Sequence, residues 1–251
     1  MKYLIFREKG NVGTIILNNP KKLNALNYDM AVELDALLDK IAKSDLRVVI
    51  IRGNGNSFCS GGDISFEAEL ARIPKKEARR KLSFMQDTLA RLELLPQVVI
   101  AVIHGYAVGG GSELAMASDI RIGLPSSVFS HPEVALGLVP PLGGTRRLAR
   151  LVGIGRAKYL LFTAQKIGAR RALEWGLLDF VVPGKKLEVF LRQMVTSIGS
   201  YSPKAIALTK KLMTDAFHDD LIDKKEIDGY FACSGTAYNR AAFERFLRKK
   251  K

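Results

Sequence analysis

Two glutamates and two clusters of glycine are the residues of this chain whose types and spacing could do chemistry. Glu113 follows Gly109–Gly111 after a single serine, Glu133 comes directly after a proline, and Gly61–Gly62 form the second cluster. Glycine lets a backbone N–H approach a ligand without a Cβ in the way, and a helix N-terminus adds partial positive charge. Gly109–Gly111 could therefore hold an oxyanion. A tight turn, followed by an acidic residue in the first turn of a helix, explains this run equally well.

These residues must be positioned by strands and helices that the sequence predicts around them. Val98–Ile103 has the composition and length of a buried strand, and Ser112–Ser118 has helical spacing. The glycine run is therefore expected at a strand-to-helix junction. Val48–Arg52 predicts another buried strand ahead of Gly61–Gly62, whose loop could donate a second N–H.

The rest of the chain alternates strand and helix, which is typical of an α/β fold. The expected elements are a hairpin of Tyr3–Glu8 and Val12–Leu17, a helix from Tyr28 to about Lys43 capped by Asn27, a charged helix over Lys75–Leu94 ended by Pro96, and, after Pro183 and Gly184, helices over Leu187–Ile198, Lys204–Phe217 and Asp219 to about Lys249.

Other chemistries have little support in the sequence. The three histidines, His104, His131 and His218, follow no metal-ligand spacing, and His104 is expected to have a structural role. Nucleophilic catalysis would need Ser112, Cys59 or Ser60 beside a base, and the GxSxG pattern is absent. Phosphate-loop and dinucleotide-binding fingerprints are absent as well.

Composition favours one compact enzyme domain without a membrane span. The chain has 251 residues, of which 47% are hydrophobic, and this is enough to bury a sizeable core. Its longest apolar runs are far shorter than the roughly 20 residues that a membrane-spanning helix needs. The two cysteines, Cys59 and Cys233, give no disulfide framework and favour a reducing compartment such as the cytoplasm.

Six sequence blocks, in order, resemble the crotonase superfamily, which is the enoyl-CoA hydratase/isomerase family. The blocks are LNNPKKLNAL from Leu17, SFCSGGDI from Ser57, HGYAVGGGSELAMASDI from His104, HPEVALGLVPPLGGTRRLARLVG from His131, ALEWGLLDFVVP from Ala172 and SPKAIALTKKLM from Ser202, and the resemblance ends near Ala241–Phe243. It covers nearly the whole chain.

The resemblance implies a role for each residue that matches a family motif. Gly62 and Gly110 match the two amide donors of an oxyanion hole, while Glu113 and Glu133 match the acid/base pair of the hydratases. Because both glutamates are present, hydration of a 2-enoyl-CoA is favoured over isomerisation or other enolate chemistry, which remain alternatives. The implied substrate-binding residues are Leu23, Ala25, Ser60, Gly61, Asp63, Ile64 and Phe243.

The resemblance also implies an α/β fold made of a crotonase-like spiral of ββα turns with a helical C-terminal trimerisation region. Residues 1–183 would form the core with the acyl-CoA site and residues 184–251 the helical region. A homotrimer or a dimer of trimers is expected, with coenzyme A as part of the substrate and no metal or other cofactor. Phe246 stands where many relatives carry a lysine near the CoA phosphates, which Arg245, Arg248 or Lys249 could replace.

Positive charge is concentrated in the second half of the chain. Residues 1–125 carry a net charge of +3 and residues 126–251 carry +11, which together give the formal +14. Such a surface could attract the phosphates of coenzyme A, could bind RNA, or could simply be solvated without a partner. An RNA-binding protein on the same fold is therefore a further alternative, although no RNA-recognition motif is present.

Overall fold

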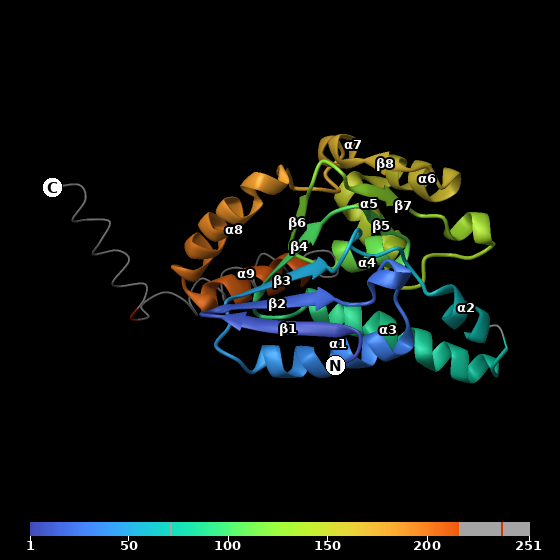
Figure 1. The fold of residues 1–251 in the computed structure, drawn as a ribbon, viewed down its shortest axis with the longest axis horizontal. Coiled ribbons are helices and arrows are strands. Elements are labelled where there is room, and N and C mark those ends of the chain that lie inside the picture. Colours follow the sequence, from blue (N-terminus) through green and yellow to red (C-terminus); the bar gives the residue numbers. More distant parts are fainter. Residues whose placement is uncertain (71, 216–236, 238–251) are drawn as a thin grey trace.

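The computed structural model describes residues 1–70, 72–215 and 237, which form two sheets surrounded by helices (Figure 1). The larger sheet has the strand order β1-β2-β3-β4-β6-β9, in which β1 and β2 are antiparallel and every later pair is parallel. The smaller sheet has the order β5-β7-β8. The strands are β1 Leu4–Lys9, β2 Val12–Leu17, β3 Val48–Gly53, β4 Val98–Ile103, β5 Tyr106–Val108, β6 Ile120–Gly123, β7 Val128–Ser130, β8 Ile167–Gly168 and β9 Phe180–Val181.

Helices connect these strands and cover both faces of the larger sheet. The α-helices are α1 Tyr28–Ala42, α2 Ile64–Leu70, α3 Lys75–Glu93, α4 Gly110–Met116, α5 Gly144–Val152, α6 Ile154–Thr163, α7 Ala169–Glu174, α8 Gly184–Gly199 and α9 Pro203–Asp215. Two short 3-10 helices, η1 Pro20–Lys22 and η2 Glu133–Leu136, complete the described elements. This mixed α/β architecture agrees with the expected fold class.

The core follows from the alternation of side chains along the strands. Val49, Ile51 and their neighbours on the same face pack with the apolar sides of α1 and α3, whereas Val48 and Ile50 pack on the opposite face with Leu187 and Leu191 of α8. Successive residues of a strand point to opposite faces, so the apolar run of β3 supplies both layers. Helix α8, at the start of the C-terminal region, thus packs against the larger sheet.

Several predicted elements are confirmed. The β1–β2 hairpin pairs Lys9 with Val12, and the side chain of Asn27 accepts a hydrogen bond from the amide of Met30, 2.8 Å away, at the start of α1. Helix α3 ends at Glu93, ahead of Pro96. The helix expected over Asp219–Lys249 lies outside the described residues, and the division of the chain at residue 183 stays a prediction. No helix in the described part of the chain is long and apolar enough to cross a membrane.

Candidate active site

The glycine run lies at a strand-to-helix junction, as expected, but the strand is β5 rather than β4. Gly109 follows β5 with φ +50°, in the left-handed region that favours glycine, and its amide donates to the carbonyl of Ser130, 2.9 Å away. Gly111 packs so closely on the backbone carbonyl of Cys59 that a Cβ would overlap it. Gly110 begins helix α4, where the first N–H groups have no acceptor within the helix.

The second glycine cluster lies against the first one. Cys59 forms a β-bridge with Ala107, and a Cβ built on Gly61 would lie 2.8 Å from the carbonyl oxygen of Val108 and 3.7 Å from the amide nitrogen of Gly110. Two loops that are far apart in the sequence therefore meet at the N-terminus of α4.

The amide of Gly62 is oriented by hydrogen bonds of its two neighbours. The Gly61 carbonyl accepts from the Leu26 amide, and the Asp63 amide donates to the Leu26 carbonyl. The N···O distance is 2.7 Å in each bond. Because the residues on either side of Gly62 make these bonds, the N–H of Gly62 points away from Leu26. Gly62 itself is an exposed residue.

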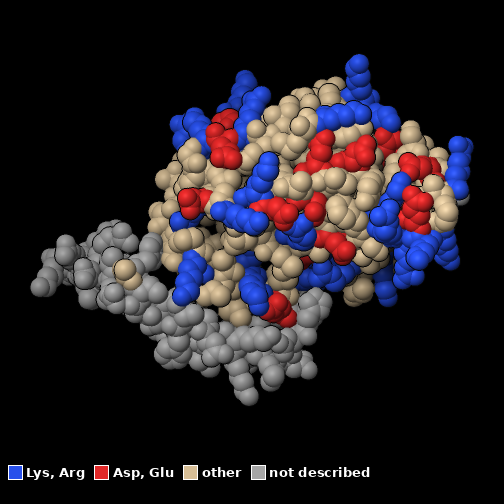
Figure 2. Space-filling model, turned by 90° about the horizontal axis from the view of Figure 1, so that it is seen from below, with Lys and Arg blue, Asp and Glu red and all other residues tan. Residues whose placement is uncertain are grey.

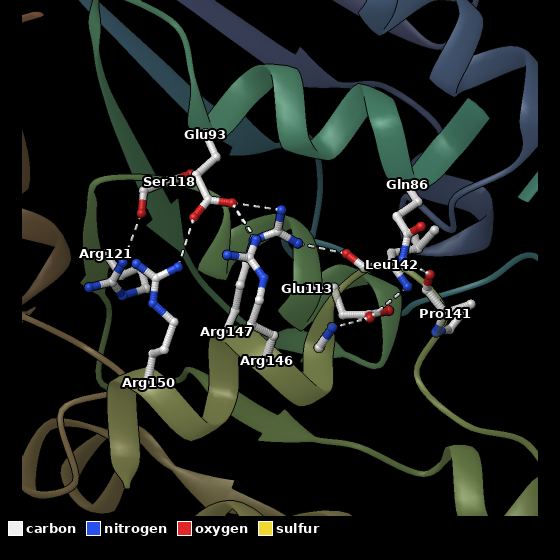
Figure 3. A network of polar contacts seen from close by, with 11 residues as sticks. Gln86, Glu93, Glu113, Ser118, Arg121, Pro141, Leu142, Arg146, Arg147 and Arg150 are labelled. Carbon is white, nitrogen blue, oxygen red and sulfur yellow. Dashed lines mark hydrogen bonds and ion pairs between the residues drawn. The ribbon is translucent and has the colours of Figure 1, made fainter. Parts of the chain in front are cut away.

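Glu113 is fully buried on α4, and its carboxyl group accepts hydrogen bonds from the segment that leads into α5 (Figure 3). Its Oε1 accepts hydrogen bonds from the amides of Leu142, at 2.9 Å, and Gly144, at 2.7 Å. Its Oε2 has no hydrogen-bond partner among the described residues. Burial, supported by the charge of Glu133, raises the pKa of Glu113 to about 7, although the two amide hydrogen bonds and Arg147 act to lower it.

Glu133 approaches the same junction from η2. It is buried, and neither of its carboxyl oxygens has a hydrogen-bond partner in the described part of the chain. A Cβ built on Gly109 would lie 3.0 Å from Oε1 of Glu133, and a Cβ built on Gly110 would lie 3.9 Å from Oε2 of Glu113. The two carboxyl groups therefore flank consecutive glycines. Burial raises the pKa of Glu133 above its ordinary value.

This arrangement can support acid–base chemistry beside two backbone amides. Each glutamate has at least one carboxyl oxygen without a hydrogen-bond partner among the described residues. Burial and the charge of Glu133 raise the pKa of Glu113 to about 7, so Glu113 is partly protonated near neutral pH. A carboxylate that can take a proton and a carboxylic acid that can give one are thus available at one place. The amide of Gly110 lies at the start of α4, and that of Gly62 lies in the loop that packs against it.

Sequence reasoning missed a third carboxyl group, that of Glu67 on α2. Its Oε1 lies where a Cβ on Gly62 would be, and its charge helps to raise the pKa of Glu133. Partial burial raises the pKa of Glu67 as well. The only signal in the sequence was a glutamate one helical turn after Asp63, which is a common surface pattern.

Apart from Phe243, the predicted substrate-binding residues lie on two segments that hydrogen-bond to each other, and their exposure differs. The amide of Ser60 donates to the carbonyl of Leu23 over 3.0 Å, which joins two of the predicted segments. Asp63 is buried, forms an ion pair with Lys22 at 2.6 Å and accepts from the Ser65 amide at 2.9 Å, so its carboxylate holds the loop and the start of α2. Ala25 is buried and the side chain of Ile64 is exposed. Phe243, together with Arg245, Phe246, Arg248 and Lys249, lies outside the described residues.

A buried serine–histidine pair is a further contact that the sequence did not predict. Ser112 Oγ lies 3.2 Å from Nε2 of His131, and both residues are buried. Burial lowers the pKa of His131 to about 4 and raises that of the Cys59 thiol to about 12, so neither group is ionised near neutral pH. His104 contacts the carbonyl oxygen of Gly55 at 2.9 Å.

We expect His131→Gln to make the fold less sensitive to acid. The unfolded chain binds a proton at His131 near pH 6.5 and the folded chain only near pH 4, so this residue makes the wild-type protein less stable as pH falls through that range. Linkage between proton binding and folding means that His131 lowers the free energy of unfolding by about 2 kcal/mol at about pH 5. Urea unfolding of both proteins at neutral and acidic pH measures it.

Comparison with the variant is essential because Glu113 acts in the opposite direction. Because the pKa of Glu113 is raised, the free energy of unfolding falls as pH rises from the ordinary pKa of glutamate towards about 7. The difference between wild type and His131→Gln removes this common contribution. An identical pH dependence of the unfolding free energy in the two proteins would contradict a buried, neutral His131.

Comparisons with known proteins agree with this geometry. The family model for enoyl-CoA hydratase/isomerase matches residues 7–251. A short-chain-enoyl-CoA hydratase of Clostridium acetobutylicum is 38% identical over 99% of this chain and 95% of its own length. The crystal structure of an enoyl-CoA hydratase from Bacillus anthracis superposes with a TM-score of 0.92 at 34% identity, over 98% of this chain and 96% of that one.

A third similar protein was solved with a ligand. This Thermobifida fusca protein, in complex with acetoacetyl-CoA, has a TM-score of 0.81 and 30% identity, and the match covers 92% of this chain and 94% of that one. The family match spans nearly all of the described fold, including both glycine loops and both glutamates. The chain therefore belongs to the enoyl-CoA hydratase/isomerase family, the crotonase superfamily.

Proposed function

We propose that this protein hydrates 2-enoyl-CoA thioesters to 3-hydroxyacyl-CoA. The observation that carries the proposal is the pair of buried glutamates, Glu113 and Glu133, whose carboxyl oxygens beside Gly109 and Gly110 have no hydrogen-bond partner in the described part of the chain. Full-length similarity to a short-chain-enoyl-CoA hydratase supports the same reaction and favours short acyl chains.

The chemistry of hydration requires what these groups can supply. Water must lose a proton as its oxygen attacks C3, C2 must gain a proton, and negative charge develops on the thioester oxygen in between. Glu113 and Glu133 divide the two proton transfers, because one carboxyl is charged while the other is protonated. The amides of Gly62 and Gly110 hold the enolate oxygen. A single such donor contributes about 100- to 1,000-fold in rate.

Coenzyme A enters as part of the substrate, and the proposed reaction needs no other cofactor. The complex of the Thermobifida fusca protein with acetoacetyl-CoA supports binding of an acyl-CoA. Hydration transfers protons and water only, so the residues named above suffice for it. Among the described residues, no three side chains are grouped as a metal site would require.

We further propose that the chain acts in the cytoplasm as a homotrimer or a dimer of trimers. The buried free thiol of Cys59 supports the cytoplasm, and the family resemblance supports the assembly. The part of the C-terminal region expected to complete the acyl-CoA site, including Phe243, lies among residues 216–251.

RNA binding is the weaker alternative. Figure 2 shows Lys and Arg interspersed with Asp and Glu over the face in view, rather than gathered into one basic patch. Surfaces that bind nucleic acid concentrate positive charge, whereas an interspersed surface is typical of a solvated protein. The charge of this face thus gives no support to an RNA site.

A kinetic assay tests the proposal. We expect crotonyl-CoA to lose its conjugated double bond and to yield 3-hydroxybutyryl-CoA on addition of the protein. We also expect a lower KM for the CoA thioester than for the matching pantetheine thioester, with the gap narrowing at high salt. Absence of hydration across a panel of enoyl-CoA thioesters, together with RNA affinity that falls steeply with salt, would favour the alternative.

A further inference from the structure

The segment Leu142–Gly144 holds Glu113 in place and is itself held by a buried arginine. Leu142 uses both of its backbone groups: its amide donates to Oε1 of Glu113 over 2.9 Å, and its carbonyl accepts from Nη1 of Arg147 over 2.7 Å. The guanidinium of Arg147 folds back under Gly143, where it occupies the space of a side chain. Figure 3 shows Arg147, on α5, reaching towards Leu142.

The other edge of the Arg147 guanidinium is fixed by Glu93, the last residue of α3. Oε2 of Glu93 lies 2.9 Å from Nε and 2.8 Å from Nη2 of Arg147, which is a two-point contact. Arg147 is 4% exposed, so its charge is removed from water and depends on these partners. Glu93 also pairs with Arg146 at 3.1 Å and with Arg150 at 3.6 Å. Gln86 of α3 donates to the carbonyl of Pro141 over 3.0 Å.

We propose that Arg147, braced by Glu93, is the positioning residue that holds the Leu142–Gly144 segment against Glu113 and keeps the Glu113 carboxyl ready for proton transfer. This inference rests on the proposed hydratase function, in which Glu113 is one half of the acid/base pair. Arg147 reaches this segment by its hydrogen bond to the Leu142 carbonyl. It acts through the Leu142 amide and through its positive charge.

The hydrogen bonding of Arg147 and its positive charge can be tested separately, because the first depends on the shape of the guanidinium and the second does not. The planar guanidinium can bind Glu93 with two nitrogens while a third reaches Leu142, and a lysine ammonium cannot reproduce this fork. The charge favours the ionised form of Glu113 and so lowers its pKa, against burial and the repulsion by Glu133, which raise it. The negative charge of Glu67 in turn raises the pKa of Glu133.

The test compares Arg147→Met, Arg147→Lys and Arg146→Met by kcat, KM and pH profile. For Arg147→Met we expect kcat to fall about tenfold or more with little change in KM, because a small displacement of a catalytic group is costly. The limb of the pH profile that reports Glu113 should move to higher pH, because the positive charge is lost. Arg147→Lys should lower kcat while leaving this limb near its wild-type position.

Arg146→Met is the matched control, since Arg146 lies on the same helix and pairs with the same Glu93 from a more exposed position. We expect it to change kcat by about twofold at most, as is usual for exposed ion pairs. If Arg147→Met does not fold, Arg147→Lys decides: wild-type kcat in that variant would overturn the positioning role. A folded Arg147→Met enzyme with wild-type kcat and pH profile would overturn it as well.

A measurement without turnover separates this inference from the proposed function. In protein labelled with carbon-13 at glutamate carboxyl groups, the resonance missing from Glu113→Gln identifies Glu113. We expect its pKa to be higher in Arg147→Met than in wild type, whether or not the enzyme hydrates any substrate tested. An unchanged titration of Glu113 would overturn the electrostatic role of Arg147, whereas a shifted titration in a protein without hydratase activity would contradict only the proposed reaction.

Discussion

Glu113→Gln and Glu133→Gln are each expected to lower kcat for hydration by about 100-fold or more, while KM changes little. Glutamine has nearly the shape of glutamate but can neither accept nor release the catalytic proton. At Glu113 the amide oxygen of glutamine can still accept the hydrogen bonds of Leu142 and Gly144, so the loop should stay in place. Steady-state kinetics with crotonyl-CoA, at several pH values, measure the effect.

Glu67→Gln is the comparison variant for this experiment. It changes a third carboxyl group near Gly62 that has no assigned proton transfer, so its effect on kcat should be far smaller. The charge of Glu67 raises the pKa of Glu133. Glu67→Gln should therefore move the limb of the pH profile that reports Glu133 to lower pH. Near wild-type hydration by Glu113→Gln or Glu133→Gln would show that the residue concerned is not part of the acid/base pair.

The second large effect is expected at the two glycines of the proposed oxyanion hole. A Cβ on Gly110 would lie 3.2 Å from Leu26 and 3.5 Å from Leu142, so the side chain of Gly110→Val would crowd the space in front of the amide. Gly62→Pro removes the other N–H outright. We expect Gly62→Pro to reduce kcat by about 100- to 1,000-fold, the usual cost of losing one such donor. Gly110→Val should abolish the reaction, because its side chain would push the thioester carbonyl away from the Gly110 amide.

Gly62→Ala provides the control for Gly62→Pro, because alanine adds a Cβ but keeps the N–H. That Cβ meets the flexible end of the Glu67 side chain, which can move aside. Circular dichroism must first show that the variants are folded. Loss of activity in Gly62→Pro with retention in Gly62→Ala supports the amide as a donor, and a folded, fully active Gly62→Pro enzyme would exclude it.

Local rules explain why much of the fold could be predicted. The hairpin of β1 and β2, the cap at Asn27 and the buried strand Val98–Ile103 depend on residues that are close in sequence. Strand β5, with only three residues, was not predicted, because its hydrogen bonds are made with β7 and its pattern is too short to show periodicity.

The candidate site could be predicted only in part, for the same physical reason. The types of Glu113 and Glu133 suggested acid–base chemistry, but their meeting at Gly109–Gly110 depends on contacts between distant loops. Such contacts were expected from the family resemblance rather than from spacing. The positions of Glu67, beside Gly62, and of His131, beside Ser112, follow from tertiary packing and had no specific signal in the sequence.

The most direct test of the central claim is to follow oxygen from the solvent into the product. The wild-type protein is incubated with 2-pentenoyl-CoA in water enriched in oxygen-18, and the products are separated and analysed by mass spectrometry. Hydration at Glu113 and Glu133 predicts 3-hydroxypentanoyl-CoA with one solvent-derived oxygen at C3, formed far more slowly by Glu113→Gln and Glu133→Gln. Formation of 3-pentenoyl-CoA without solvent-derived oxygen would contradict it and would identify an isomerase.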